Sequence, residues 1–447
     1  MTFRSQSADF RAAVFSFRAH CVRCFGLESN QNRGPNDTEM ARFNDLGVKT
    51  ASTRVAVVAA GAISPLGFGL NETLASLRAN KDCVSPVTRF DVEKCRCKTA
   101  GQISDDSLLC RQRNGRKTER LHRATRMIMA VFEELFGQDP EFKPEVSVIG
   151  TTSGGMSFGE DYYRALHRHR GLRHSPGWIA NYPPQKPVID AQDAFGISAP
   201  CQIIANACAS GTNAIGHAFE CVRSGKYQRV LTGGYDALSE LVFIGFDSLQ
   251  AATPEKCRPF DRDRSGMVLG EGAAFFALEN LESARARDAR VLGEIIGYGI
   301  STDNHHLTQP DPSGSGPRRA MERALQNAGC SADEIDYINA HGTATTLNDA
   351  AEGKAIAELF EGVPISSTKG MMGHSLGAAG AIEAAVCLLA LQAQFLPPNI
   401  NFRNPDQDLD LNVVPNESRE AKIDIALSNS FGFGGTNASI LIQKLAA

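Results

Sequence analysis

The chain has 447 residues, of which 42% are hydrophobic and 21% charged, the composition of an ordinary globular protein. This length is enough for two or three domain-sized units, and a formal net charge of −4 argues against nucleic-acid binding by the protein as a whole. No uninterrupted run of about 18 apolar residues is present, so the sequence predicts no membrane span.

The 12 cysteines are scattered and lack the dense spacing of a secreted disulfide scaffold, which indicates buried thiols in a reducing compartment. Cys21 and Cys24 form a CxxC motif, and Cys95 and Cys97 form a CxC motif. Neither motif has a second ligand pair at zinc-site spacing, so we expect no metal site.

Residues 1–53 differ in composition from the rest. Segment 1–27 contains four arginines, one acidic residue and a short apolar stretch, namely Arg4, Arg11, Arg18, Arg23, Asp9 and Ala12–Phe17. An arginine-rich, acid-poor start resembles an organellar transit peptide. A disordered tail, or a start codon assigned too far upstream, is an equally good interpretation. We expect no catalytic residue here, and a cytoplasmic protein unless this extension directs it to a mitochondrion or plastid.

A regular alternation of strands and helices begins at Arg54. Apolar runs predict strands over Val55–Ala60, Glu145–Thr151, Cys201–Ala205, Arg229–Tyr235, Ala273–Leu278, Val291–Gly299, Ile335–Ala340, Ile425–Asn429 and Ala438–Gln443. Helical patterns cover Asn71–Ala79, a segment that starts near Cys208, Pro317–Ala328 and Ser375–Gln392. Such alternation favours mostly parallel sheets with helices on both faces. Two comparable halves, joined near residue 290, indicate a duplicated fold.

Cys208 lies in the segment Asn206–Gly216, where a strand runs into small residues and then into a helical pattern. This order predicts a sharp turn at a helix N-terminus, where the helix dipole and free N–H groups favour the thiolate. The small neighbours Ala207, Ala209 and Gly211 are expected to leave room for a substrate. A cysteine in this setting can accept an acyl group as a thioester, although a buried structural cysteine fits the same pattern.

Two histidines later in the chain favour the catalytic interpretation. His341 follows a strand within Asn339–Asp349 and opens a loop rich in Gly and Thr, and His374 lies in the glycine-rich segment Lys369–Gly380 before an apolar helix. Ligands of α/β folds bind at such strand-to-helix junctions. A cysteine with histidines from separate segments is the arrangement of a covalent acyl-transfer enzyme.

A competing motif is Gly373–Gly377, which fits the G-x-S-x-G pattern of serine hydrolases and would make Ser375 the nucleophile. That pattern is short and should follow a strand directly, whereas here it follows a loop. A hydrolase would also leave Cys208 and His341 without a role. We therefore favour Cys208 as the nucleophile.

Cys208, His341 and His374 with their surroundings resemble the β-ketoacyl synthase family of the thiolase-like fold. Further segments agree with that family in order and spacing, namely Arg258–Gly266 with Gly270–Ala273, Ser301–His306 and the glycine-rich Asn429–Asn437. The likeness covers residues 54–447. It implies an α/β, thiolase-like fold in which duplicated βαβαβ halves, residues 54–290 with the nucleophile and 291–447 with the histidines, form a five-layered α-β-α-β-α core.

The resemblance also implies a role for each matching residue. Cys208 carries the acyl chain, while His341 and His374 bind the malonyl thioester carbonyl and stabilise the enolate formed on loss of carbon dioxide. Lys369 and Glu383 match the supporting charged pair of the family. Two neutral imidazoles can each donate one hydrogen bond to the enolate oxygen, each worth on the order of a few kcal/mol in a water-excluded site.

The resemblance assigns further residues to substrate contacts. Thr343, Thr345 and Ser301 match positions that hold the pantetheine arm of the substrate. Phe433 matches the gating aromatic residue, and its backbone N–H with that of Cys208 would form the oxyanion hole.

The implied reaction is the decarboxylative Claisen condensation of a Cys-bound acyl chain with malonyl-acyl carrier protein (malonyl-ACP) in fatty-acid elongation. It needs no metal or organic cofactor, and the acyl-enzyme step predicts ping-pong kinetics. Three departures from the elongating enzymes, Ser375, Thr346 and Ser210, leave a ketosynthase of polyketide or polyene biosynthesis open as the alternative. An intact Cys208 argues against a catalytically silent partner subunit.

The implied partners are the acyl carrier protein, which brings the acyl-ACP and malonyl-ACP substrates, and a second copy of the chain in a homodimer. Basic segments can steer an acidic carrier protein, although a solvated charged face is the alternative interpretation. The candidates are segment 111–126, with Arg111, Arg113, Arg116, Lys117, Arg120, Arg123 and Arg126, and segment 164–173, with Arg164, Arg168, Arg170 and Arg173.

Overall fold

The structure is a computed structural model that describes residues 53–105, 108, 121–168 and 180–445. The predicted extension up to residue 52, with its CxxC motif, lies outside the described residues. So do most of the basic segment 111–126 and the end of the basic segment 164–173.

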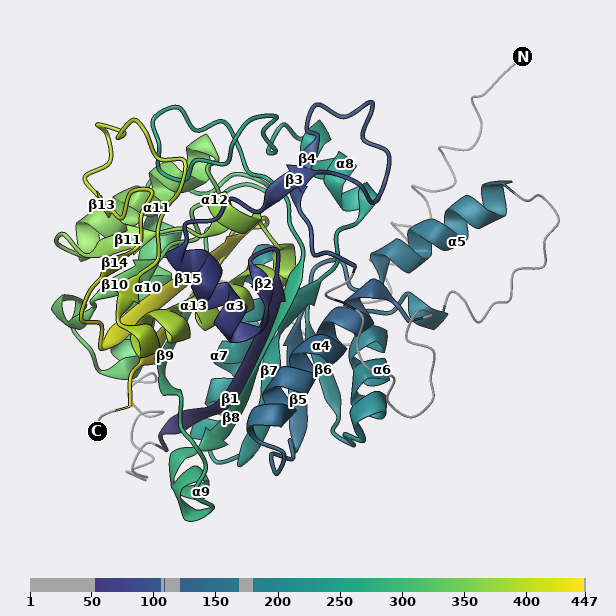
Figure 1. Cartoon of the computed structure of the whole chain (residues 1–447). Coiled ribbons are helices and arrows are strands. Elements are labelled where there is room, and N and C mark those ends of the chain that lie inside the picture. Colours follow the sequence, from purple (N-terminus) through teal and green to yellow (C-terminus); the bar gives the residue numbers. More distant parts are fainter. Residues whose placement is uncertain (1–52, 106–107, 109–120, 169–179, 446–447) are drawn as a thin grey trace, which may run out of the picture. The chain divides into compact units, whose positions relative to one another are not determined.

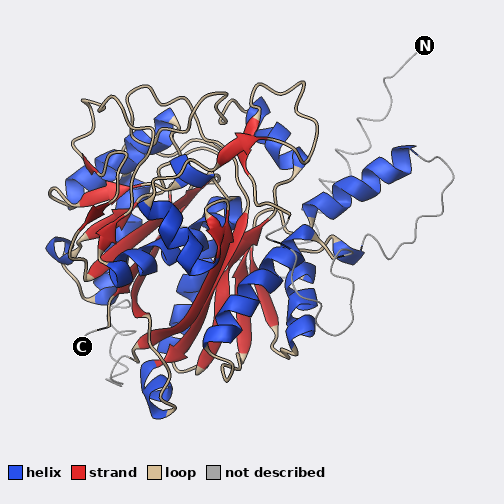
Figure 2. Ribbon diagram, viewed as in Figure 1, coloured by secondary structure: helices blue, strands red, loops and turns tan. Residues whose placement is uncertain are grey.

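The described residues form the following elements, coloured by chain position in Figure 1 and by type in Figure 2. The strands are β1 Val55–Ser64, β2 Gly67–Phe68, β3 Val84–Pro86, β4 Thr99–Gly101, β5 Val146–Gly150, β6 Cys201–Ile204, β7 Arg229–Asp236, β8 Gly272–Asn280, β9 Gly293–Thr302, β10 Tyr337–Asn339, β11 Pro364–Ser366, β12 Phe395–Leu396, β13 Asn412–Val413, β14 Arg419–Glu420, β15 Ile425–Gly432 and β16 Thr436–Gln443. The helices are α3 Gly69–Arg78, α4 Arg123–Gln138, α5 Met156–Arg168, α6 Lys186–Phe195, α7 Ser210–Arg223, α8 Glu240–Ser248, α9 Leu281–Ala286, α10 Ser315–Ala328, α11 Thr346–Leu359, α12 Lys369–Met372 and α13 Ala379–Ala393. Short 3₁₀ turns cover Ala207–Ala209, Ala332–Glu334 and Leu376–Ala378.

The largest sheet has 12 strands and consists of two half-sheets with the same strand order. The first half-sheet runs β6-β5-β7-β8-β1, with the short β2 paired to β1, and the second runs β11-β10-β15-β16-β9 with β13 added at its edge. When the strands of each half-sheet are numbered by their order along the chain, leaving out β2 and β13, both half-sheets have the spatial order 3-2-4-5-1. Residues Val55–Val57 of β1 pair with Gly293–Ile295 of β9 and join the halves. The predicted duplication of the fold is confirmed, while the residue bounds proposed for the halves stay a prediction.

The expectation of mostly parallel sheets is wrong for the long strands. β8 pairs antiparallel with both β1 and β7, and β16 pairs antiparallel with both β9 and β15. Parallel pairing is confined to the outer part of each half-sheet, where β5 pairs with β6 and β7 and where β10 pairs with β11 and β15. A strand buried on both faces is a continuous apolar run whichever way its neighbour runs, so the sequence pattern does not reveal the pairing direction.

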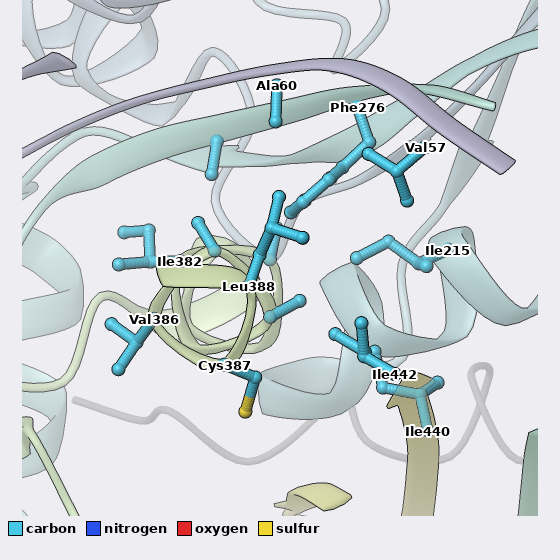
Figure 3. Packing of buried hydrophobic residues seen from close by; sticks show 14 of the residues in the cluster. Val57, Ala60, Ile215, Phe276, Ile382, Val386, Cys387, Leu388, Ile440 and Ile442 are labelled. Carbon is cyan, nitrogen blue, oxygen red and sulfur yellow. The ribbon is translucent and has the colours of Figure 1, made fainter. Parts of the chain in front are cut away.

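Helices form three layers around the two half-sheets (Figure 2). α4 and α6 cover the outer face of the first half-sheet, and α10 and α11 cover the outer face of the second. α7 and α13 pack between the half-sheets. In Figure 3, α13 is surrounded by Val57 and Phe276 of β1 and β8 on one side and by Ile440 of β16 on the other. The layers therefore follow the predicted α-β-α-β-α order.

The segment Leu376–Ala393, which includes α13, is the one stretch of the described chain that is long and apolar enough to cross a membrane. In this fold 89% of it is buried within the protein, so it is the central core helix. Glu383 lies within this segment, fully buried and paired with Lys369.

Candidate active site

The predicted catalytic residues meet in a pocket with a volume of about 290 Å³. Cys208 reaches it from the turn before α7, His341 from the loop after β10, and His374 from the turn before α13. The two central helices thus both begin at this pocket, one from each half of the fold. The predicted residues that line the pocket are Cys208, His341, His374, Thr343, Thr345 and Phe433.

Cys208 occupies the 3₁₀ turn Ala207–Ala209, directly before α7. Ala207 has a φ of 56°, a left-handed conformation that costs roughly 1 kcal/mol or more for a residue other than glycine. Two hydroxyl groups hold this turn, because the Ala207 carbonyl accepts hydrogen bonds from Ser210 Oγ at 2.5 Å and Thr152 Oγ1 at 3.1 Å. The predicted sharp turn at a helix N-terminus is present.

The role expected for Gly211 is different in the structure. A Cβ atom at Gly211 would come within 2.7 Å of the Gly377 carbonyl oxygen. Gly211 therefore lets α7 approach the turn before α13, and it does not make room for a substrate. The consequence is that the backbone next to Cys208 is held directly against the segment that carries His374.

The helix N-terminus at Cys208 favours the thiolate, whereas burial acts in the opposite direction. Burial raises the pKa of the Cys208 thiol to about 12, because only 6% of the residue is exposed and the charged form loses its solvation. The nearby Lys369 charge and the backbone N–H groups of Phe433 and Cys208 lower this pKa, and they only partly offset the burial. Both N–H groups therefore lie beside the sulfur, and their role as an oxyanion hole stays a prediction.

His341 and His374 face each other with their ring centroids 5.3 Å apart and their planes at 85°. Both side chains are buried, and Nδ1 of His341 and both ring nitrogens of His374 have no hydrogen-bond partner among the described residues. Burial and the Lys369 charge lower the pKa of both imidazoles well below the ordinary value. The rings are therefore neutral at physiological pH, and each can donate one hydrogen bond to a substrate oxygen.

The His374 turn is held by the segment that precedes β8. The His374 backbone N–H donates to the Val268 carbonyl at 2.7 Å, and the His374 carbonyl accepts from the Gly270 N–H at 2.9 Å. The motif that resembled the family near Gly270–Ala273 thus acts structurally, because its backbone fixes the position of a predicted catalytic side chain.

Lys369 and Glu383 form a fully buried ion pair between α12 and α13. The Lys369 amino group donates to Glu383 Oε1, and burial raises the pKa of Glu383 to about 7 although Lys369 lowers it. Removing one partner of such a pair costs about 3–5 kcal/mol, since the other charge stays buried. Burial is the main reason why the pKa of both histidines is low, and the Lys369 charge lowers it further.

Two acidic residues that the sequence analysis missed hold the His341 loop. The backbone N–H groups of His341 and Gly342 donate to the two carboxylate oxygens of Glu352, each at 2.8 Å. The Ala344 N–H donates to Asp349 Oδ1 at 3.1 Å. Both acids lie in α11, one helical turn apart. Acidic residues of a helix usually face solvent, so nothing in the sequence indicated that these two are buried.

Phe433 lies in the turn between β15 and β16 and stacks on Phe246 of α8, with ring centroids 5.5 Å apart and an interplanar angle of 17°. Both rings line the pocket together with Cys208. An aromatic ring on a glycine-rich turn can move more easily than one in a strand. This placement fits the gating role implied for Phe433, with Phe246 as the ring it must leave.

Ser301 is not among the described residues that line the pocket. Its hydroxyl donates to the Gly316 carbonyl at 2.6 Å and accepts from Asn437 Nδ2 at 3.3 Å, so it is already occupied within the fold. Asp303 and Asn437 line the pocket instead, joined by a hydrogen bond of 2.6 Å. The sequence analysis quoted the two segments that contain them but chose a different residue. The pantetheine role of Ser301 stays a prediction.

Ser375 does not have the setting of a nucleophile. It follows α12 and not a strand, it is fully buried, and its Oγ donates to the Glu271 carbonyl at 3.4 Å. It does not appear among the described pocket residues. The rejection of the serine hydrolase motif agrees with this geometry.

Three arginines of the predicted basic segments are already paired within the fold. Arg123 is only 8% exposed and donates to both carboxylate oxygens of Glu271, at 2.7 and 2.8 Å. Arg126 lies 3.7 Å from Asp105, and Arg164 forms ion pairs within and beyond α5. Arg123 therefore does not contribute to a basic surface, because runs of charge in a sequence do not show which members turn inward. Docking of the carrier protein by one of these segments stays a prediction. The remaining residues 111–120 and 169–173 lie outside the described residues.

Two family models match the chain, and together they span most of it. "Beta-ketoacyl synthase, N-terminal domain" matches residues 52–284, and "Beta-ketoacyl synthase, C-terminal domain" matches residues 292–403. The chain is 36% identical over 416 residues to the 3-oxoacyl-[acyl-carrier-protein] synthase 2 of Synechocystis sp., which covers 88% of this chain and 98% of that protein. It is 37% identical over 408 residues to the protein of the same name from Coxiella burnetii, and the match covers 88% of this chain and 99% of that protein.

Solved structures give the same picture. The ishigamide ketosynthase/chain length factor is 33% identical with a TM-score of 0.82, over 89% of this chain and 100% of that one. A β-ketoacyl synthase from Burkholderia phymatum is 30% identical with a TM-score of 0.79, over 88% of this chain and 100% of that one. A type II polyketide ketosynthase in complex with its acyl-carrier protein is 26% identical with a TM-score of 0.78, over 88% of this chain and 100% of that one. These likenesses extend over the same part of the chain as the predicted motifs.

Proposed function

The chain belongs to the β-ketoacyl synthase family, and we propose that Cys208, His341 and His374 carry out the family's condensation reaction in it. The enzyme is a condensing acyltransferase, a 3-oxoacyl-[acyl-carrier-protein] synthase of fatty-acid elongation. One observation supports the residue assignment above all. A buried thiol and two neutral imidazoles, from three separate segments, converge on one pocket.

The first step transfers the acyl chain from the carrier to Cys208. The Cys208 sulfur attacks the thioester carbonyl, the C–S bond to the carrier breaks, and the thiol proton leaves with the carrier's sulfur. Negative charge develops on the carbonyl oxygen, where the N–H groups of Phe433 and Cys208 can donate to it. No cofactor is needed, since one thioester is exchanged for another.

The second step forms the carbon–carbon bond. The malonyl group loses carbon dioxide, and the electron pair of that bond moves onto the thioester as an enolate. His341 and His374 donate hydrogen bonds to the enolate oxygen, and this role is supported by three ring nitrogens that have no partner in the described part of the chain, His341 Nδ1 and both nitrogens of His374. The enolate carbon then attacks the acyl thioester, and the Cys208 sulfur leaves and takes up a proton.

The substrate arm enters through the mouth of the pocket. The Thr343 and Thr345 hydroxyls lie 2.9 Å apart on the pocket wall, where they can bind the amides of a pantetheine arm. The carrier protein is the partner that brings this arm, as in the solved ketosynthase complex with its acyl-carrier protein. A ketosynthase of polyketide or polyene biosynthesis is the second candidate, supported by the likeness to the ishigamide ketosynthase. Turnover with saturated acyl-ACP against polyene acyl-ACP distinguishes the two.

The experiment that tests this function is mass spectrometry of the enzyme after incubation with acyl-ACP. We expect one acyl adduct, located on Cys208 by peptide mapping, because this thiol alone faces the pocket beside two N–H donors. The Ser375→Ala variant should form the adduct at a rate within about twofold of the parental enzyme. An adduct on Ser375, or no adduct on either residue, would contradict the proposed mechanism.

We further propose that the enzyme is a homodimer. β6 is an edge strand of the 12-stranded sheet, with backbone groups on one side that no described strand pairs. Exposed apolar side chains lie on α5 and α6 and on the segment between them, namely Tyr163, Leu166, Tyr182 and Ile189. An unpaired edge strand beside an apolar surface favours pairing with a second chain. Sedimentation velocity should give twice the mass of one chain, and a monomer mass at micromolar concentration would refute this.

A further inference from the structure

Asp236 is a fully buried carboxylate for which the reaction steps above have no use. It is the last residue of β7, and its side chain has no exposed surface. No described basic side chain forms an ion pair with it. Burying a carboxylate without a cation beside it costs solvation free energy. The hydrogen bonds that Asp236 accepts must therefore compensate for this cost.

The first carboxylate oxygen of Asp236 holds the loop that follows β5. Asp236 Oδ1 accepts from Thr151 Oγ1 at 2.7 Å, from the Ser153 N–H at 2.8 Å and from Ser153 Oγ at 2.6 Å. The Gly154 N–H lies 3.3 Å from the same oxygen, so Oδ1 accepts hydrogen bonds from three residues of this loop. This loop therefore has its conformation set by Asp236.

The second oxygen joins that loop to the other half of the fold. Asp236 Oδ2 accepts from the Thr152 N–H at 2.8 Å and from the Gly377 N–H at 2.7 Å. Gly377 lies in the turn before α13, three residues after His374. A Cβ atom at Gly377 would come within 2.5 Å of the Thr152 nitrogen, so no other residue type allows this approach without a shift.

The same loop reaches the nucleophile. Thr152 Oγ1 donates to the Ala207 carbonyl at 3.1 Å, in the strained turn that presents Cys208. A continuous chain of hydrogen bonds thus runs from the Cys208 turn through Thr152 and Asp236 to the His374 turn. Its members come from β7 and from three separate turns.

We propose that Asp236 is a positioning residue that fixes the Cys208 turn relative to the His374 turn. Carbon–carbon bond formation depends on this relation, because the enolate held by the histidines must reach the thioester on Cys208. Acylation depends on the Cys208 turn alone, which Thr152 holds. A misplacement of about 1 Å can cost about 100-fold in rate. The inference rests on the proposed function, since it needs these two residues to act on one substrate pair.

Asp236→Asn is the informative variant because it keeps the size of the side chain and removes an acceptor. The carboxylate oxygens of Asp236 face only donors, four of them backbone N–H groups that cannot reorient. An asparagine NH₂ group in either position would face such a donor. We expect kcat to fall by about 10- to 100-fold, with KM for both carrier substrates changed by less than about threefold.

Glu279→Gln is the matched control for stability. Glu279 is also fully buried, and it pairs with Arg229 at the opposite end of the β7–β8 strand pair from Asp236. It should lower Tm while kcat stays within about twofold of the parental value. If both variants lose equal Tm and equal kcat, the effect of Asp236→Asn is general destabilisation and the inference fails.

Thr152→Val tests the chain of hydrogen bonds even if Asp236→Asn does not fold. Thr152 is exposed, so the variant should keep its Tm and lose only the hydrogen bond to the Ala207 carbonyl. We expect acylation of Cys208, followed by mass spectrometry, to slow by about threefold or more. An unchanged acylation rate, or an active Asp236→Asn enzyme with parental kcat, would overturn the inference. An inactive parental enzyme would instead overturn the proposed function.

Discussion

Cys208→Ala is expected to lower kcat/KM for condensation by at least about 10⁴-fold, because the acyl chain then has no atom on which to form a thioester. The other groups near the pocket cannot substitute. Ser375 is buried and bonded to the Glu271 carbonyl, and both imidazoles are neutral donors held for the enolate. The measurement is product formation from acyl-ACP and malonyl-ACP, with acylation followed separately by mass spectrometry.

Cys221→Ala is the matched control for this variant. Cys221 is buried in α7, the same helix that Cys208 precedes, and its sulfur packs in the central core away from the pocket. It should retain kcat within about twofold and lose at most about 1–2 kcal/mol of stability. If Cys208→Ala retained more than a trace of condensation, another nucleophile would have to be sought.

His374→Ala is expected to lower kcat for condensation by about 10²- to 10³-fold, because one of the two donors to the enolate oxygen is lost. Acylation of Cys208 should stay within about threefold, since the acyl carbonyl is bound by backbone N–H groups and not by His374. The two steps are separated by measuring acyl adduct formation in the absence of malonyl-ACP and carbon dioxide release in its presence. Equal loss of both steps would contradict the role assigned to His374.

His374→Asn distinguishes a lost hydrogen bond from a disturbed turn. An asparagine amide can donate one hydrogen bond, as the neutral imidazole does, and its backbone can keep the bonds to Val268 and Gly270. We expect it to recover about tenfold or more of the activity lost in the alanine variant. If the two variants are equally inactive while both keep the parental Tm, donation to the enolate is not what His374 contributes.

Most of the fold could be predicted from local pattern. Each predicted strand overlaps an observed one, from Val55–Ala60 within β1 to Ala438–Gln443 within β16. Apolar runs of four or more residues, flanked by turn residues, carry this information because a strand of this fold is buried on both faces. Short edge elements such as β11 and β13 have only two or three residues, which is too few for a periodic signal.

The electrostatics of the site could not be predicted in this way. A cysteine at a helix N-terminus favours the thiolate by local reasoning, yet burial raises the pKa of Cys208 to about 12. Segments from both halves of the fold bury Cys208. The sequence around Cys208 alone therefore does not reveal how deeply this thiol is buried. The same reason explains why Arg123 proved to be buried against Glu271 when its sequence neighbours suggested an exposed basic surface.

The sequence alone predicted which residue types carry the chemistry here. A thiol and two imidazoles, each among small residues, are chemical groups that the order of the chain reveals directly. The predicted strand-to-helix junction is present at Cys208 and His341 and is wrong for His374, which follows the short helix α12. The tertiary structure decided how these groups are held. Burial and the Lys369 charge lower the pKa of both imidazoles, Glu352 fixes the His341 loop, and Asp236 joins the turns of the nucleophile and the second histidine. These partners lie in other segments of the chain, and a hydrogen bond between distant segments depends on packing and leaves no periodic trace in the sequence.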